Sequence, residues 1–266
     1  MRLGFLGTGK MGTAICKGLT DTGTWPAADI CGADIAPAAR HAFKQKTGAT
    51  AVENAADMVA QSDAVVVAVK PQIAERVLTP LASLLGNKLV ISIAAGIPLA
   101  KLTNWVGHNR VVRVMPNTPM MIGCGAAVFC CENEVTASDR GIVETILGAV
   151  GVVLEMPEQN MDAVTALSGS GPAYVFELMQ ALIDAAVALG LQPEDARRLT
   201  AHTVAGAAEM VKLNMGTPDE LRDAVTSPGG TTEAGLSVLT DHKFRHLMSD
   251  VLRRARDRSV ELGKGQ

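Results

Sequence analysis

The sequence has no excess of positive charge, no long apolar run and no cysteine pair of the C-x-x-C type. Its net charge of -3 does not indicate a nucleic-acid-binding surface. The longest apolar runs, such as residues 64–69, are far shorter than the roughly 20 residues that span a bilayer. No cleavable signal precedes the first expected strand, which starts at Leu3, so we expect a cytoplasmic protein without membrane association.

The cysteines and histidines do not suggest a metal site. The five cysteines stand at positions 16, 31, 124, 130 and 131. An odd number without paired spacing argues against a disulfide framework or a zinc site. We expect buried, small apolar side chains, with Cys130 and Cys131 alternating across a strand. His242 and His246 have the i, i+4 spacing of metal ligands on one helical face, but no H-E-x-x-H pattern accompanies them. We interpret them as a surface pair.

Residues 1–158 alternate short apolar runs with helical stretches. We expect strands at 3–6, 30–34, 64–69, 89–94 and 111–115, weaker strands at 126–130 and 152–156, and helices at 11–19 and 37–47. This alternation predicts a parallel, doubly wound α/β sheet covered by helices on both faces. The interval 1–158 is therefore the expected Rossmann-like dinucleotide-binding domain.

Residues 159–266 have a helical pattern throughout. The stretch 161–191 is interrupted only at SGSGP, and further helices are expected at 194–213, 218–225 and 231–263. The segment 174–189 is apolar nearly all round, and such a helix is normally buried on every side. A domain of roughly a hundred residues has difficulty surrounding it alone. We therefore expect an all-α dimerisation domain and a homodimer; the alternative is the central helix of a monomeric bundle.

The stretch GFLGTGKMG places Gly7, Gly9 and Gly12 between the first expected strand and the first expected helix. In a G-x-G-x-x-G loop the glycines allow a tight turn, close approach of a phosphate and close helix packing. The N–H groups at the helix start then meet the pyrophosphate. Asp34 ends the second strand, where an acidic side chain suits the ribose hydroxyls of NAD. The alternative is a tight turn that binds no ligand.

Two further strand ends carry candidate cofactor contacts. The strand AVVVAV stops at Lys70 and Pro71, and LVISIA stops at Ala94, Ala95 and Gly96. Ligands of open α/β sheets collect at the carboxyl ends of strands. The small residues would permit close approach of a nicotinamide ribose, whereas Lys70 is either a cofactor contact or a surface lysine before a proline.

In the helical half, VTSPGGTT separates two expected helices. Exposed N–H groups at a helix start, beside the hydroxyls of Ser227, Thr231 and Thr232, would suit a small anion such as a carboxylate. The alternative is a helix–helix turn with a threonine N-cap. The stretch ALSGSGPAYVF lies at the domain junction and is either a helix restart or a bend toward the cofactor.

The stretches GFLGTGKMG, AVKPQ, RVMPNTP, ALSGSGPAY and VTSPGGTT occur in this order along the chain. With them the chain resembles the Δ1-pyrroline-5-carboxylate reductases over essentially its whole length. That family reduces the cyclic imine to L-proline with NAD(P)H, in the last step of proline synthesis. The resemblance implies a Rossmann domain, a helical dimerisation domain and an active site at the dimer interface. Some members assemble dimers into decamers.

The resemblance also implies individual site residues. The expected pyrophosphate contacts are Leu6, Gly7, Thr8, Gly9, Lys10 and Met11. Those expected near the ribose and nicotinamide are Ala68, Val69, Lys70, Pro71, Ile93, Ala94 and Ala95, and Asn54 is expected near the adenosine phosphate. The substrate carboxylate would be held by Ser227, Gly229, Gly230, Thr231 and Thr232. Thr232 would lie closest to the imine ring, where its hydroxyl would donate to the imine nitrogen or relay a proton through water.

One residue departs from the family's pattern. The family commonly has a serine or another small neutral residue where this chain has Asp34. The carboxylate should weaken binding of the 2′-phosphate of NADPH, while Asn54 remains compatible with it. We therefore expect appreciable use of NADH beside NADPH.

Two other classes of protein share some of these sequence features. The β-hydroxyacid dehydrogenases also join a Rossmann domain to a helical one, but they have a lysine six residues after the first glycine of an interdomain G-x-G motif. Counted from Gly169, that position holds Val175. A non-enzymatic cofactor-binding protein would explain GTGKMG but would leave SPGGTT without a purpose.

Overall fold

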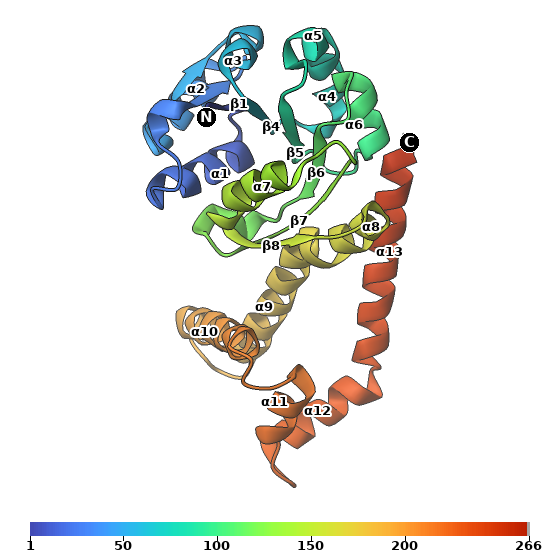
Figure 1. The fold of residues 1–266 in the computed structure, drawn as a ribbon. Helices are drawn as coiled ribbons and strands as arrows, with labels where there is room; N and C mark the ends of the chain where they lie inside the picture. Colours follow the sequence, from blue (N-terminus) through green and yellow to red (C-terminus); the bar gives the residue numbers. More distant parts are fainter. Residues whose placement is uncertain (265–266) are drawn as a thin grey trace. The chain divides into compact units, whose positions relative to one another are not determined.

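The computed structural model describes residues 1–264, which are drawn as a ribbon in Figure 1. By compactness the chain divides into two units. The first unit comprises residues 1–170 and the chain from Ala255 onward, and the second comprises Gly171–Arg254. The domain boundary expected at 158/159 stays a prediction.

The first unit is built on one eight-stranded sheet with the order β3-β2-β1-β4-β5-β6-β7-β8. The strands are β1 (Leu3–Leu6), β2 (Ile30–Ala33), β3 (Thr50–Val52), β4 (Ala64–Val67), β5 (Leu89–Ser92), β6 (Val111–Met115), β7 (Gly125–Cys131) and β8 (Gly151–Glu155). All the strands expected from the sequence are present. The order reverses beside β1, so the loops after β1 and β4 flank the switch point at which doubly wound sheets bind ligands.

The expectation of a wholly parallel sheet is wrong for one pair, because β7 runs antiparallel to β6. The connection between them, residues 116–124, contains only the short 3₁₀ turn η3 (Thr118–Ile122). A parallel pairing needs a crossover of a dozen or more residues, and this connection is too short. The neighbouring pair β7 and β8 is parallel, with helix α7 (Ala137–Gly148) between the two strands.

Helices cover both faces of the sheet, as expected. One core packs α1 (Lys10–Asp21), α2 (Pro37–Thr47) and α7 against the sheet, and includes Ile15, Phe43 and Val143. The other core lies under α3 (Ala55–Gln61), α4 (Pro71–Leu78), α5 (Ala82–Leu85) and α6 (Leu99–Val106), and includes Met58 and Leu102. The short helix α8 (Met161–Val164) and a π-helical turn (Thr165–Gly169) end this part of the chain.

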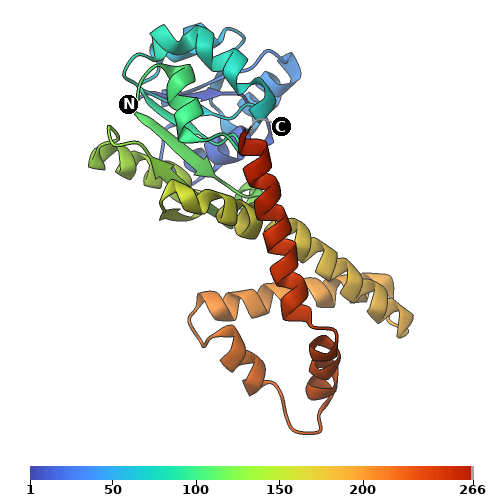
Figure 2. The same cartoon turned by 90° about the vertical axis from the view of Figure 1, so that its right-hand side faces the viewer.

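The last turns of helix α13 (Phe244–Lys264) belong to the first unit. Lys101 donates its Nζ to the carbonyl of Gly263 at 2.9 Å, and the buried Ser259 donates to Asp162 at 2.7 Å. The end of α13, the red helix of Figure 2, therefore lies beside the first turn of α6 and beside Gly96 in the loop that follows β5. This contact was not predicted from the sequence.

The second unit is entirely helical, as expected. Its helices are α9 (Gly171–Ala188), α10 (Pro193–Lys212), α11 (Pro218–Ala224), α12 (Thr231–Asp241) and the first part of α13. Helices α9 and α10 pack against each other. No residue of α9 is buried in the single chain, and Val175, Phe176 and Leu182 are exposed. The apolar helix expected at 174–189 thus presents its side chains on the surface of one chain.

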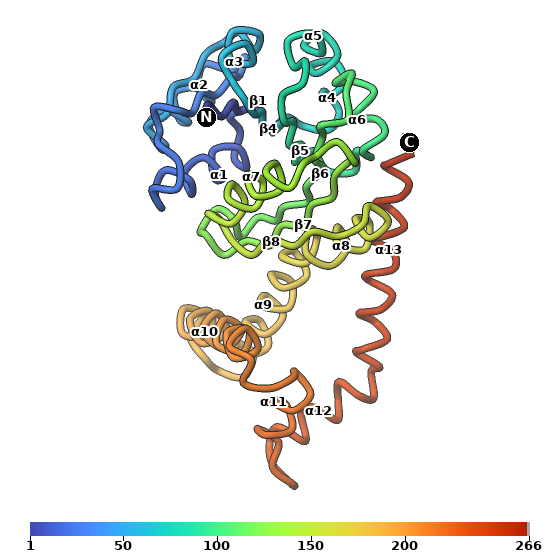
Figure 3. Tube along the Cα trace, viewed as in Figure 1, coloured from blue at the N-terminus to red at the C-terminus, as the bar shows by residue number. Residues whose placement is uncertain are grey.

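The expectation of a single helix at 231–263 is wrong, because the chain turns between α12 (Thr231–Asp241) and α13 (Figure 3). Lys243 has a φ of 52°, in the left-handed region that ends a helix. His242 is the C-cap of α12, whereas His246 lies in α13. The two histidines are exposed, as expected of a surface pair, but they do not share a helical face.

The cysteines largely follow the expected pattern. Cys130 is buried and its neighbour Cys131 is half-buried, so the two alternate across β7. Burial raises the pKa of the Cys16 and Cys130 thiols to about 12, which keeps both protonated at neutral pH. Cys124 is exposed, so the expectation of burial is wrong there. Between Met1 and Lys264, no helix has the length and apolar character to cross a membrane.

Candidate active site

The three glycines of the first loop have three different environments. Gly7 has a φ of 101°, and a Cβ on it would lie 2.7 Å from the carbonyl oxygen of Ala68. A Cβ on Gly12 would lie 2.6 Å from the carbonyl oxygen of Gly7. A Cβ on Gly9, in contrast, would meet no atom within 4 Å. Packing therefore requires the first and third glycines, whereas Gly9 faces the open space that a phosphate would occupy.

The start of α1 is open to a ligand. Gly9 is its N-cap and offers no side chain to cap the helix. The first N–H that bonds back into the turn is that of Thr13, to Gly9 at 2.9 Å. The preceding N–H groups of the turn have no intrahelical partner by geometry. The buried Thr8 is held by the hydroxyl of Thr13, which donates to its carbonyl at 3.0 Å. These features fit a pyrophosphate group at the helix start.

The neighbouring strand ends form the rest of the candidate cofactor site. Ala68 donates its N–H to Leu6 at 2.8 Å, and Ile93 donates to Val67 at 3.0 Å, so the loops after β1, β4 and β5 lie side by side. Ile93 and Ala94 are buried, whereas Ala95 and Lys70 are exposed. The structure thus brings together the predicted residues at positions 6–11, 68–71 and 93–95 at one edge of the sheet.

Asp34 is fixed beside the glycine loop. Its Oδ2 accepts the N–H of Thr8 at 2.9 Å, and its Oδ1 accepts the N–H of Ala36 at 2.9 Å. Asp34 also donates its own N–H to Val52, which places the loops after β2 and β3 next to each other. Asn54 lies in the second of these loops and caps α3 through the N–H of Ala56. Both predicted adenosine-side residues are therefore at the same sheet edge.

Two charged residues at this edge were not predicted. Arg40, in the second turn of α2, donates to the carbonyl of Asp34 at 2.7 Å and to the carboxylate of Glu53 at 3.1 Å. Arg40 and Glu53 are separated by 13 residues. The pairing of β2 with β3 brings them together, and neither residue belongs to a motif that would have identified it.

The predicted carboxylate site lies in the second unit, in the loop between α11 and α12. Gly229 has a φ of 71°, and Gly230 donates its N–H to the carbonyl of Ser227 at 3.0 Å. Gly230 is the N-cap of α12 and has no side-chain cap. The alternative of a threonine N-cap is therefore wrong, because Thr231 and Thr232 occupy the first turn itself.

A glutamate that the motif did not include supports this loop. Glu233, in the first turn of α12, accepts the N–H of Gly229 at 2.8 Å. The remaining N–H groups of the turn, beside the hydroxyls of Thr231 and Thr232, suit a small anion. Thr232 is half-buried and Ser227 is exposed. The loop thus unites the five predicted substrate residues at one open helix start.

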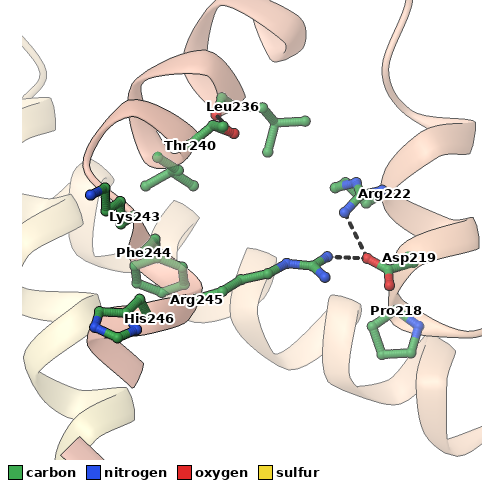
Figure 4. A pocket seen from close by; sticks show the side chains of 10 residues that line it. Pro218, Asp219, Arg222, Leu236, Thr240, Lys243, Phe244, Arg245 and His246 are labelled. Carbon is green, nitrogen blue, oxygen red and sulfur yellow. Dashed lines mark hydrogen bonds and ion pairs between the residues drawn. The ribbon is translucent and has the colours of Figure 1, made fainter. Parts of the chain in front are cut away.

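A separate cavity of about 1010 Å³ lies in the second unit, between α11, α12 and the start of α13 (Figure 4). Arg245 and Arg222 converge on the carboxylate of Asp219 across it. The Arg245 guanidinium holds the pKa of Asp219 below its usual value. None of the five predicted substrate residues lines this cavity, so it is distinct from the SPGGTT loop.

The doubly wound sheet, its open glycine loop and the switch point beside β1 define a dinucleotide-binding α/β protein with a second, helical unit. The family described as NADP oxidoreductase, coenzyme F420-dependent, matches residues 2–96. The family described as pyrroline-5-carboxylate reductase dimerisation matches residues 158–262.

Relatives that match nearly the whole chain indicate its family. The chain is 42% identical over 264 residues to the pyrroline-5-carboxylate reductase of Arabidopsis thaliana, covering 99% of this chain and 96% of the relative. A solved pyrroline-5-carboxylate reductase from Coxiella burnetii has a TM-score of 0.93 and 36% identity, with 98% of each chain covered. The Plasmodium falciparum enzyme, solved with NADP bound, has a TM-score of 0.89 and 33% identity, covering 99% of this chain and 98% of that one.

The chain belongs to the pyrroline-5-carboxylate reductase family. The family and the fold class expected from the sequence motifs are confirmed.

Proposed function

We propose that this protein reduces Δ1-pyrroline-5-carboxylate to L-proline with NAD(P)H, the last step of proline biosynthesis. The observation that carries the proposal is the 42% identity to a reductase of this name across 99% of the chain. The open glycine loop and the open start of α12 support it, since they supply the two anion sites that the reaction needs. A spectrophotometric assay of pyrroline-5-carboxylate reduction tests it.

The first unit would hold the cofactor through the residues predicted for it. The start of α1 suits the pyrophosphate, and the small residues after β4 and β5 suit the nicotinamide ribose. When bound, the reduced nicotinamide supplies the hydride. Asp34 would meet the hydroxyls of the adenosine ribose, which favours appreciable use of NADH.

The second unit would hold the substrate. The N–H groups and hydroxyls of the SPGGTT loop bind the carboxylate and thereby orient the flat ring, and such orientation can lower the barrier by several kcal/mol. A protonated imine is already a good electrophile, so a strong acid is unnecessary. Where the imine is neutral, Thr232 would donate a hydrogen bond to its nitrogen or pass it a proton through water.

The protein would act as a homodimer. The apolar α9, with no buried residue in one chain, is the feature that supports this, because a helix of such composition is stable when its faces are covered. Assembly of dimers into a decamer, as the family resemblance implies for some members, and a cytoplasmic location, as expected from the sequence, are part of the same proposal.

A further inference from the structure

The 2′ position of the adenosine ribose distinguishes NADH from NADPH. In doubly wound sheets an acidic residue at the end of the second strand meets the 2′-hydroxyl, whereas a nearby arginine accommodates a 2′-phosphate. This chain has both groups at that place. Asp34 directly follows β2, and the guanidinium of Arg40 lies 2.7 Å from the carbonyl oxygen of Asp34.

Both Nη atoms of the Arg40 guanidinium already donate a hydrogen bond. Its Nη2 donates to the carboxylate of Glu53 at 3.1 Å, while its Nη1 is held by Asp34. The Asp34 carboxylate is itself held at this sheet edge by the N–H groups of Thr8 and Ala36. The Arg40 guanidinium thus lies between the backbone carbonyl of Asp34 and the carboxylate of Glu53, and the side chains of the three residues have a formal charge of -1.

We propose, on the basis of the NAD(P)H-dependent activity proposed above, that Arg40 receives the 2′-phosphate of NADP(H) and that Glu53 restrains it. Glu53 is then a specificity-determining residue. A 2′-phosphate competes with the Glu53 carboxylate for the Nη2 side of the guanidinium, and this competition weakens NADP(H) relative to NAD(H).

The exposures of the two side chains support this division of roles. The side chain of Arg40 is only 19% exposed, whereas that of Glu53 is 75% exposed. The arginine is therefore held in place by α2 and by Asp34, and it stays at the ribose edge when Glu53 loses its charge. An exposed ion pair contributes little to stability, at most about 1 kcal/mol, so variants of Glu53 should fold.

The test measures dinucleotide binding rather than turnover. Isothermal titration calorimetry gives the Kd of NADP+ and of NAD+ for the full-length wild type and for Glu53→Gln. We expect Glu53→Gln to lower the Kd of NADP+ about fivefold, the scale of one charge-assisted hydrogen bond at a partly exposed site, and to leave the Kd of NAD+ nearly unchanged. The Kd of adenosine 2′,5′-bisphosphate should fall in Glu53→Gln as that of NADP+ does. The Kd of 5′-AMP should stay nearly unchanged, as that of NAD+ does.

Three variants complete the design. In Arg40→Met the Kd of NADP+ should rise about fivefold, and adding Glu53→Gln to it should then have no effect. Arg40→Lys keeps the charge at position 40 and should retain part of the response to Glu53→Gln. Glu144→Gln, at an exposed glutamate on α7 between β7 and β8, at the far end of the strand order from β2 and β3, is the matched control for net charge and should change neither Kd.

Each outcome decides the assignment. A ratio of NADP+ to NAD+ affinity that is the same in Glu53→Gln as in the wild type overturns it, and so does a shift that persists in Arg40→Met. An equal shift in Glu144→Gln also overturns it, because net charge alone would then be the cause. A wild type that binds neither dinucleotide refutes the proposed function as well, whereas an unchanged ratio in a wild type that binds both refutes only the role of Glu53.

Discussion

The carboxylate of Asp34 accepts the N–H of Thr8 at 2.9 Å and so joins the end of β2 to the glycine loop. The negative charge is therefore fixed at the place where the adenosine ribose of a dinucleotide is bound in this fold. We therefore expect Asp34 to weaken the binding of NADPH relative to that of NADH.

Asp34→Ser should shift the preference toward NADPH. Replacing the carboxylate by a hydroxyl removes the repulsion of the 2′-phosphate and still offers an oxygen to Thr8, so kcat/KM for NADPH relative to NADH should rise about tenfold, equivalent to about 1.4 kcal/mol. Initial rates with both cofactors measure it. In the wild type, a preference for NADPH above about 100-fold, or about 2.7 kcal/mol, would contradict the account.

Gly9→Ala should weaken cofactor binding and leave the stability of the fold unchanged. The added methyl group meets no protein atom within 4 Å, and the backbone of Gly9, with φ of -68°, is one that alanine adopts. The Tm should therefore stay within about 2 °C of the wild type, while NADH should bind at least tenfold more weakly because the methyl group occupies the phosphate's space.

The matched comparison is Gly12→Ala, whose Cβ would lie 2.6 Å from a carbonyl oxygen. That variant should lose about 1–3 kcal/mol of unfolding free energy. If Gly9→Ala bound NADH as tightly as the wild type, the phosphate would not lie at Gly9.

Much of the first unit could be predicted because its strands are buried. The run AVVVAV has no polar residue to obscure it, and β4 indeed covers its first four residues. The three-residue β3 is half exposed and has no such pattern, so it was missed. The strand β7 was predicted, but its antiparallel direction was missed, although the short connection after β6 indicates it.

Other features had no signal in the sequence. Lys243 takes a left-handed conformation that lysine rarely adopts, so the break between α12 and α13 could not be read from its residue type. Arg40 and Glu53 meet because two strands pair, and that pairing is a property of the fold. The composition of the SPGGTT loop predicts a candidate anion site, but the hydrogen bond from Gly229 to Glu233 depends on how the loop folds onto α12.

Thr232→Ala should lower kcat/KM about 10- to 100-fold. The loss of the hydroxyl removes the proposed hydrogen bond to the imine nitrogen, and leaving one partner of a hydrogen bond unsatisfied costs about 1–3 kcal/mol. Thr232→Ser keeps the hydroxyl and should retain most of the activity. Thr240→Ala, an exposed threonine near the end of the same helix, is the control. Wild-type kcat and KM in Thr232→Ala would show that the hydroxyl has no such role.

Leu182→Arg should weaken self-association. The side chain lies on α9 and is 45% exposed in the single chain, so the charge should disturb an interface without disturbing the core of the chain. Sedimentation velocity should show a dimer for the wild type and a shift toward monomer for the variant. Leu84→Arg, at a side chain 40% exposed in α5, is the control and should remain dimeric. A wild type that sediments as a monomer at micromolar concentration would contradict the proposed homodimer.

The most direct test of the proposed function is the reduction of Δ1-pyrroline-5-carboxylate by the purified protein, with NADH and NADPH measured side by side. We predict that absorbance at the wavelength of the reduced nicotinamide falls with both cofactors, and that L-proline appears in equal amount. Tight binding of either cofactor without turnover of the imine would contradict the account, and turnover of a 3-hydroxyacid in its place would point to a different dehydrogenase.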